Sequence, residues 1–215
     1  MSLPLVISAK RTGSTILQNV THILLTGKKG LVPKSHGFKK TNGKVIIPIR
    51  DPRDTAISFY RTIVSNQKKI DRIADINVFK NSEILRNLNL MVDLYNFYKD
   101  NPNALIVRYE DVHTNQLGEY SNLITILSKF FELELTDELV DKVNNYLNID
   151  DMKSVSDSLA TFQKHDSNLD SSFCIHGNHI EDTNVIGWRE RVDSNIVDEL
   201  NNLYNDYIVK LNYTL

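Results

Sequence analysis

The sequence predicts a single α/β domain over residues 1–215, in which a central parallel sheet of about four or five strands lies between two layers of helices. Three short apolar runs have the length of buried strands, and they are separated by amphipathic segments of ten residues or more. Parallel strands require such long crossover connections, and their helices cover both faces of the sheet. At 215 residues the chain can build one sizeable core, whereas two full domains would be small.

The first strand is expected at Leu3–Ser8, because this run is apolar and leads into a glycine-containing turn. A helix should follow, since apolar residues recur at helical spacing at Ile16, Leu17, Val20, Ile23 and Leu24. The segment Gly27–Gly43 contains several glycines, one proline and five lysines without an apolar period. It is predicted to be an irregular connection to a second strand at Val45–Ile49.

A helix is predicted to begin at Pro52. Asp51 offers a side-chain cap, proline suits the first helical position, and Asp54 places a carboxylate in the first turn. Arg53 is expected to form only a local surface ion pair with Asp51 or Asp54.

The rest of the chain predicts one more strand and mostly helices. A third strand, Ala104–Tyr109, follows a helix with an apolar stripe at Ile84, Leu85, Leu88, Met91, Tyr95 and Tyr98. Further helices are expected at residues 120–131, 137–147 and 149–159, and near the C-terminus through Ile196, Leu200, Leu203, Tyr207 and Leu211. The segment Thr161–Asn184 is polar and without a period, which indicates a loop.

Composition excludes several classes of partner. The formal net charge of -2 gives no general basic field for nucleic acid or an anionic membrane, so any anion site must be local. The single cysteine, Cys174, allows no intrachain disulfide and suits a reducing compartment, so a cytoplasmic location is expected. No segment has the pattern of a signal peptide or the length of a transmembrane helix.

The turn between the first strand and its helix has the composition of an anion site. The first helical N–H groups lack intrahelical partners, and the helix dipole adds partial positive charge there. Cations, hydroxyls and a glycine lie together in the stretch Lys10, Arg11, Thr12, Gly13, Ser14 and Thr15. A nucleotide-triphosphate loop of the G-x-x-x-x-G-K-[ST] type would need a lysine directly after the glycine, and Ser14 stands there instead.

Two further segments make the chain similar to a known family. They are PKSHGF, at Pro33–Phe38, and RDPRDTAISFY, at Arg50–Tyr60. Together with the turn at Lys10–Thr15, called the anion corner below, they resemble the sulfotransferases that use 3'-phosphoadenosine-5'-phosphosulfate (PAPS). Weaker similarities follow in the family's order at Val107–Asp111 (VRYED), at Asp151–Lys153 (DMK) and at Gly187–Arg189 (GWR).

The resemblance implies a P-loop-NTPase-like fold and a sulfuryl transfer from PAPS to an acceptor hydroxyl on a sugar, a lipid or another small molecule. The product nucleotide would be adenosine 3',5'-bisphosphate (PAP), and no metal would be needed. By resemblance, Arg11 lies at the 5'-phosphate and the departing oxygen, and residues 12–15 cradle that phosphate. Lys10 either adds a second cation to the site or is a solvated neighbour.

The resemblance also implies roles outside the corner. Arg50 and Ser58 would hold the 3'-phosphate, and His36 would act as general base, a task that suits the pKa of histidine. Lys34 would stabilise developing charge or position His36. Tyr109 would approach the adenine and Trp188 would help to enclose the nucleotide, although either residue could instead belong to the core.

The sequence departs from the family near its C-terminus. The basic R-K-G element that normally precedes the G-x-W segment is not recognisable, and His176-Gly177-Asn178-His179 stands near its place. Cys174, His176 and His179 match no zinc signature, so no metal site is predicted. Three alternatives stay open: a non-catalytic nucleotide-binding protein, an atypical small-molecule kinase, and an interaction module without a ligand.

Overall fold

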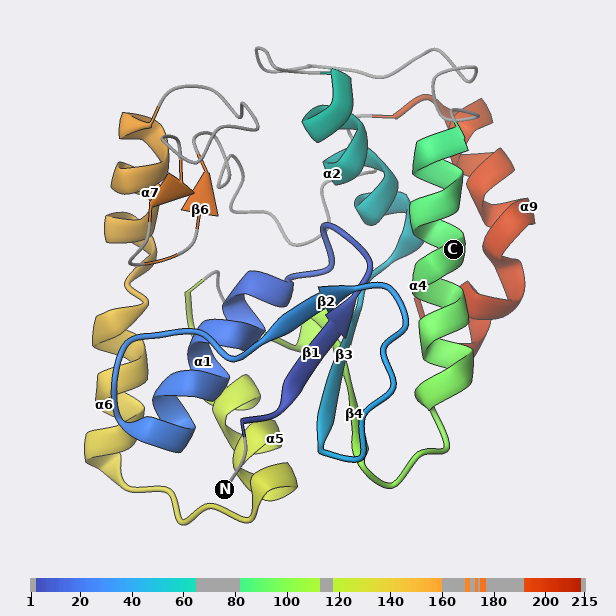
Figure 1. Ribbon diagram of the computed structural model, residues 1–215. Helices are drawn as coiled ribbons and strands as arrows, with labels where there is room; N and C mark the ends of the chain where they lie inside the picture. The colour runs from blue at the N-terminus through green and yellow to red at the C-terminus, as the bar shows by residue number, and fades with distance from the viewer. Residues whose placement is uncertain are drawn as a thin grey trace.

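The computed structural model of the protein describes residues 3–64, 82–112, 118–159, 169–170, 173, 175–176 and 192–213. At its centre is a sheet of four strands in the order β2-β1-β3-β4 (Figure 1). The strands are β1 (Leu5–Ser8), β2 (Lys34–His36), β3 (Val45–Ile49) and β4 (Ala104–Arg108). Every neighbouring pair in this sheet is parallel, which confirms the predicted α/β class.

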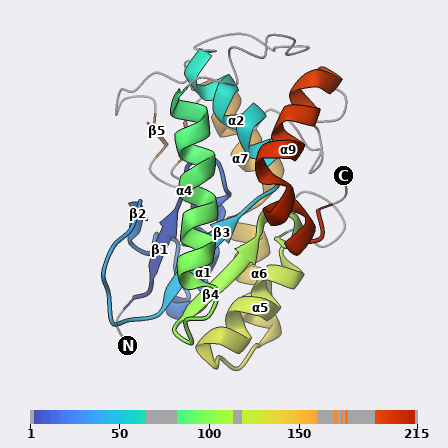
Figure 2. The same cartoon turned by 90° about the vertical axis from the view of Figure 1, so that its right-hand side faces the viewer.

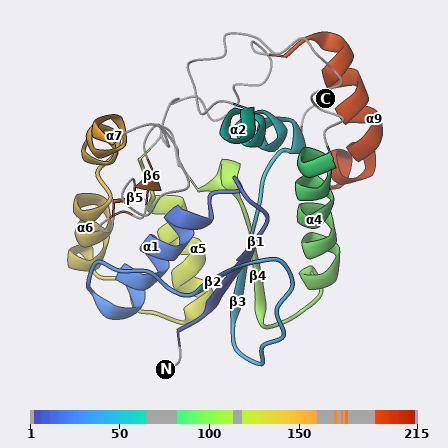
Figure 3. The same cartoon turned by 45° about the horizontal axis from the view of Figure 1, so that its top comes forward.

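Helices cover both faces of the sheet, as Figures 2 and 3 show from two further directions. One layer contains α1 (Ser14–Thr26), α5 (Ser121–Phe131), α6 (Asp137–Tyr146) and α7 (Ile149–Ser158). The other contains α2 (Pro52–Val64), α4 (Ser82–Tyr98) and α9 (Ser194–Lys210). These bounds agree closely with the helices that the apolar spacing predicts. Among the described residues, no helix is both long enough and apolar enough to cross a bilayer.

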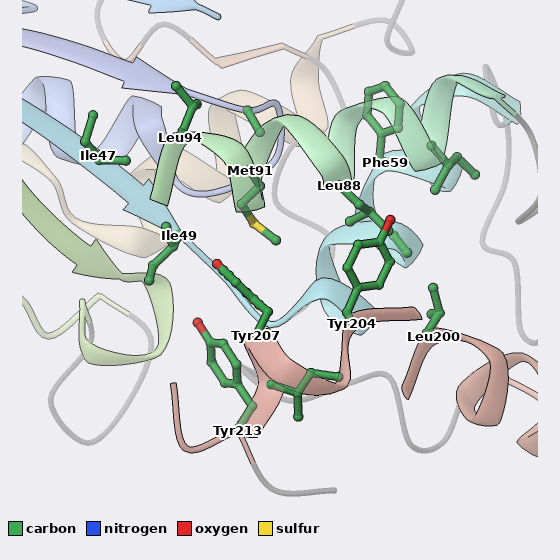
Figure 4. Packing of buried hydrophobic residues seen from close by; sticks show 14 of the residues in the cluster. Ile47, Ile49, Phe59, Leu88, Met91, Leu94, Leu200, Tyr204, Tyr207 and Tyr213 are labelled. Carbon is green, nitrogen blue, oxygen red and sulfur yellow. The ribbon is translucent and has the colours of Figure 1, made fainter. Parts of the chain in front are cut away.

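The core lies in two clusters, one on each face of the sheet, because successive strand side chains point in opposite directions. In β1, Leu5 and Ile7 join the cluster under α2, α4 and α9, whereas Val6 joins the cluster under α1 and α5. Figure 4 shows the first cluster, where side chains of α4 and α9 meet beyond the end of β3. The sheet is therefore buried on both faces.

Helix α2 begins at Pro52, as predicted, and the Asp51 Oδ1 accepts a hydrogen bond from the N–H of Arg53 at 2.9 Å. The prediction that Arg53 lies at the surface was wrong, since only 1% of the residue is exposed. Its guanidinium donates to Asp51 through Nε and Nη2 and to Asn201 of α9 through Nη1. A buried charge requires such partners, so this arginine joins α2 to α9.

Three features differ from the sequence-based expectation. Strand β2 lies inside the segment predicted to be irregular, where its exposed and half-buried side chains form no apolar run. Strand β4 ends one residue early, and Tyr109 begins a 3-10 helix, η1 (Tyr109–Asp111). The predicted loop at 161–184 contains a short antiparallel pair, β5 (Leu169–Asp170) and β6 (Ile175–His176).

Candidate anion-binding site

Four predicted site elements meet where the parallel strands end. Strand β1 ends at Ser8 and leads into the anion corner at residues 10–15, β2 ends at His36, β3 leads into Arg50, and β4 leads into Tyr109. Because the strands are parallel, these ends lie along one edge of the sheet, where open α/β sheets bind ligands. The sheet thus brings together segments that are up to about a hundred residues apart in the sequence.

The backbone of the corner is held in a strained conformation. Arg11 has a φ of 68° and Gly13 has a φ of 85°, both in the left-handed region. Thr12 is buried between them, and its Oγ1 donates to the carbonyl of Ala9 at 3.0 Å. A Cβ at position 13 would lie 2.5 Å from Cδ2 of Tyr109, so this position requires glycine for space as well as for conformation. Gly13, the residue directly before α1, therefore lies against the Tyr109 ring.

Arg11 and Ser58 are brought together across the corner. The Nε of Arg11 donates to the Oγ of Ser58, which lies on α2, at 2.9 Å. The two residues are 47 positions apart in the sequence, so this contact exists only in the folded chain. It joins the predicted 5'-phosphate corner to the predicted 3'-phosphate helix.

Arg50 is the second cation at this edge. Its Nη1 lies 3.5 Å from the carbonyl oxygen of Arg11, and its guanidinium carbon lies 4.1 Å from the centre of the Tyr109 ring. The Arg50 Nε is buried and donates no hydrogen bond within the part of the chain that the structure describes. A buried guanidinium N–H without a partner is costly, which makes this group suited to an anionic ligand.

His36 contacts the end of β1. Its Nδ1 lies 3.3 Å from the carbonyl oxygen of Ser8 and 3.2 Å from the Ser8 Oγ. Because a carbonyl oxygen can only accept, this contact favours the neutral tautomer with the proton on Nδ1 and leaves Nε2 as the basic nitrogen.

The surroundings of His36 keep it neutral. Partial desolvation lowers the pKa of His36 below its ordinary value, and the charges of Lys34 and Lys10 lower it further. The hydrogen bond with Ser8 acts in the opposite direction but does not cancel this. Both lysines are exposed residues, Lys34 on β2 and Lys10 in the corner.

Two residues that support the site were missed by the sequence analysis. The side-chain amide of Asn87, on α4, accepts from the backbone N–H of Lys10 at 2.8 Å and donates to the carbonyl of Lys10 at 3.0 Å. Glu110 accepts from the backbone N–H of Asp51 at 2.9 Å, which fixes the peptide that follows Arg50. No sequence motif contains Asn87. Glu110 belongs to the YED segment, but that similarity did not indicate its contact with Asp51.

Some predictions lie outside the described residues. These are Trp188, Cys174 and His179, while His176 is described only as part of the backbone of β6. Ser14 and Thr15 open α1, in the position predicted for a phosphate cradle. Over the described ranges, no cluster of three or more His, Cys, Asp or Glu side chains could hold a metal ion.

Comparison of the sequence with models of known protein families identifies the class of protein. A family model described as the sulfotransferase domain matches residues 29–210, so the chain belongs to the sulfotransferase family. The matched range contains His36, Arg50, Ser58 and Tyr109, but begins after the anion corner.

A solved structure supports the same fold. The crystal structure of mouse sulfotransferase SULT7A1 complexed with PAP has a TM-score of 0.65 and 13% sequence identity to this chain. The match covers 96% of this chain and 84% of the mouse chain. No match was found among curated protein sequences.

Proposed function

We propose that the protein is a PAPS-dependent sulfotransferase that sulfates a hydroxyl of a small-molecule, lipid or glycan acceptor. The main observation in support is the position of Arg50, whose buried Nε has no hydrogen-bond partner among the described residues. The guanidinium lies against Tyr109 and the corner carbonyl of Arg11, at the start of α1. An anionic group of a bound ligand would supply the acceptor that this buried N–H lacks.

The described residues fit a nucleotide that has phosphates at two positions. The amides and hydroxyls of residues 12–15 would hold the 5'-phosphate, with Arg11 beside the departing oxygen. Arg50 and Ser58 would hold the 3'-phosphate. When bound, PAPS supplies the sulfuryl group and leaves as PAP. The complex of mouse SULT7A1 with PAP supports this choice of nucleotide by similarity of fold.

His36 would act as the general base. With its proton on Nδ1 directed to Ser8, the Nε2 can take the proton of an acceptor hydroxyl as the oxygen bonds to sulfur. Its lowered pKa keeps the ring in this basic form at neutral pH. Lys34 would stabilise the negative charge that develops during the transfer, and no metal would take part.

The nucleotide is tested by thermal unfolding with PAP, ADP, ATP or AMP at equal concentrations. At a hundred times its dissociation constant, PAP should stabilise the native protein by about 2.7 kcal/mol, which raises the midpoint by several degrees. Arg50→Ala should abolish the shift, whereas Arg86→Ala, at an exposed position of α4, should retain it. A larger shift with ATP would favour the kinase alternative, and no shift with any nucleotide would contradict the proposal.

A further inference from the structure

Asn87 is a polar residue on the buried face of α4, where its neighbours along the helix are apolar. Only 7% of Asn87 is exposed, and Ile84, Leu88 and Met91 on the same face are almost fully buried. Burying an amide costs free energy unless its donors and acceptors find partners. Asn87 therefore needs a specific contact, and the apolar stripe alone does not provide one.

Both described hydrogen bonds of Asn87 go to the backbone of one residue, Lys10. The Oδ1 accepts from the Lys10 N–H at 2.8 Å, and the Nδ2 donates to the Lys10 carbonyl at 3.0 Å. Such a two-point contact fixes the orientation of the peptide as well as its position. No apolar residue at position 87 could hold Lys10 in this way.

Lys10 directly precedes Arg11, which has a φ of 68°. A non-glycine residue is strained in the left-handed region, so it persists only where the surrounding structure holds it. The Asn87 contact supplies such a constraint on one side of Arg11, and the hydrogen bond from Arg11 Nε to Ser58 supplies one on the other.

We infer that Asn87 is a positioning residue of the anion corner, which holds the Lys10 peptide so that Arg11 and the amides that follow are preorganised for the 5'-phosphate. This inference rests on the proposed nucleotide. Preorganisation improves affinity because less freedom is lost when the ligand binds. Asn87 would thus affect PAP binding through Arg11, without touching the nucleotide itself.

The test compares the dissociation constants for PAP of the wild-type 215-residue chain and its Asn87→Leu variant, measured by titration calorimetry. Leucine suits the apolar face of α4, where Ile84, Leu88 and Met91 are buried, so the protein should remain folded. We expect the dissociation constant to rise about tenfold, the size of one lost interaction. Asn87→Asp is the second variant, for use if the leucine variant does not fold. Aspartate has the shape of asparagine but cannot donate to the Lys10 carbonyl, so it should also weaken PAP binding.

A double-mutant cycle separates positioning from general destabilisation. In an Arg11→Ala background, Asn87→Leu should change the dissociation constant by less than about twofold, because the group that it positions is gone. The matched control is Asn89→Leu on the same helix, which removes an acceptor for the hydroxyl of Tyr204 at 2.9 Å. This control should leave PAP affinity unchanged even if the midpoint of unfolding falls.

Two results would overturn the inference. The first is a folded Asn87→Leu protein with wild-type PAP affinity, and the second is a tenfold loss that persists without Arg11. Failure of the wild-type protein to bind PAP would instead overturn the proposed function, and the positioning role with it.

Discussion

His36 illustrates how neighbouring residues set the chemistry of a single side chain. A histidine in a lysine-rich segment is usually an ordinary polar residue, and the sequence indicates a base only through the adjacent family motif. In the structure, the contact of Nδ1 with the Ser8 carbonyl selects a tautomer, and the charges of Lys34 and Lys10 disfavour protonation. These contacts support the role of a base that is neutral and ready at physiological pH.

We predict that His36→Ala lowers the sulfuryl transfer rate by about 10² to 10⁴-fold, the usual range for a general base. PAP affinity should stay near the wild-type value, because His36 is not placed among the phosphate-binding groups. The two quantities are measured by turnover with PAPS and an accepted hydroxyl substrate, and by PAP calorimetry. A non-catalytic binding protein would show no turnover to lose.

The pH dependence of the rate gives a second test of the same residue. Since the pKa of His36 is lowered, the wild-type rate should fall with acid only below the ordinary histidine value of about 6.5. Lys34 and Lys10 both lower this pKa, so Lys10→Ala should move the acid limb of kcat/KM to higher pH. Lys40→Ala, at an exposed position that is not among the causes of the shift, is the control. If the acid limb of kcat/KM did not move in Lys10→Ala, the assignment of His36 as the general base would be contradicted.

At the scale of elements, Glu110 joins three parts of the fold that the sequence keeps far apart. It lies in η1, accepts from the N–H of Asp51 at the start of α2, and accepts from the hydroxyl of Tyr213, after α9, at 3.1 Å. Burial raises the pKa of Glu110, while the hydrogen bond from Asp51 partly opposes this shift. The C-terminal segment is therefore tied to the peptide that follows Arg50.

We predict that Glu110→Ala destabilises the protein by about 1–3 kcal/mol, because the buried N–H of Asp51 and the Tyr213 hydroxyl lose their acceptor. Glu110→Gln should be milder, since its amide oxygen can still accept. Chemical denaturation at several pH values measures the free energy of unfolding of both variants.

The sign of the pH effect follows from the raised pKa. The contribution of Glu110 to stability is fully present below its ordinary pKa of about 4.5 and is lost as the pH rises through the raised value. Glu110→Gln lacks this loss, so its stability relative to wild type should improve as the pH rises through that window. Glu134→Gln, at an exposed position of the connection between α5 and α6, should show no such trend. If the difference in stability between Glu110→Gln and the wild type were constant with pH, the raised pKa of Glu110 would be contradicted.

Strand β2 shows why one element was not predicted. Its three residues form no apolar run, and it exists because β1 offers a hydrogen-bonding edge, with Ser8 opposite His36 in the register. Such a strand is stabilised by its neighbour and not by its own composition.

At the scale of the whole molecule, the two core clusters share one sheet. Leu88 of α4 lies in one cluster and Leu127 of α5 in the other, and both are fully buried. Because β1 and β3 contribute side chains to both clusters, neither layer of helices can be lost without exposing the opposite face of the strands.

We therefore predict that the chain unfolds as a single domain in one cooperative transition. Leu88→Ala and Leu127→Ala should each lower the stability by about 2–5 kcal/mol and should move the same transition. Calorimetry of both variants measures this, and Leu203→Ala, at an exposed position of α9, should change little. Two separate transitions, each sensitive to one substitution, would contradict a single domain.

Local patterns in the sequence were enough to predict the α/β class, nearly all helix bounds and the segments of the candidate site, because apolar periodicity and helix caps act over a few neighbouring residues. It also indicated the sulfotransferase family through the motifs at Pro33–Phe38 and Arg50–Tyr60. The contacts between these segments could not be predicted and are visible only in the folded chain. Arg11 contacts Ser58, Tyr109 lies against Gly13 and Arg50, and Asn87 and Glu110 support the corner. These contacts join residues from different strands and helices, and their geometry is set by how the parallel sheet aligns its strand ends.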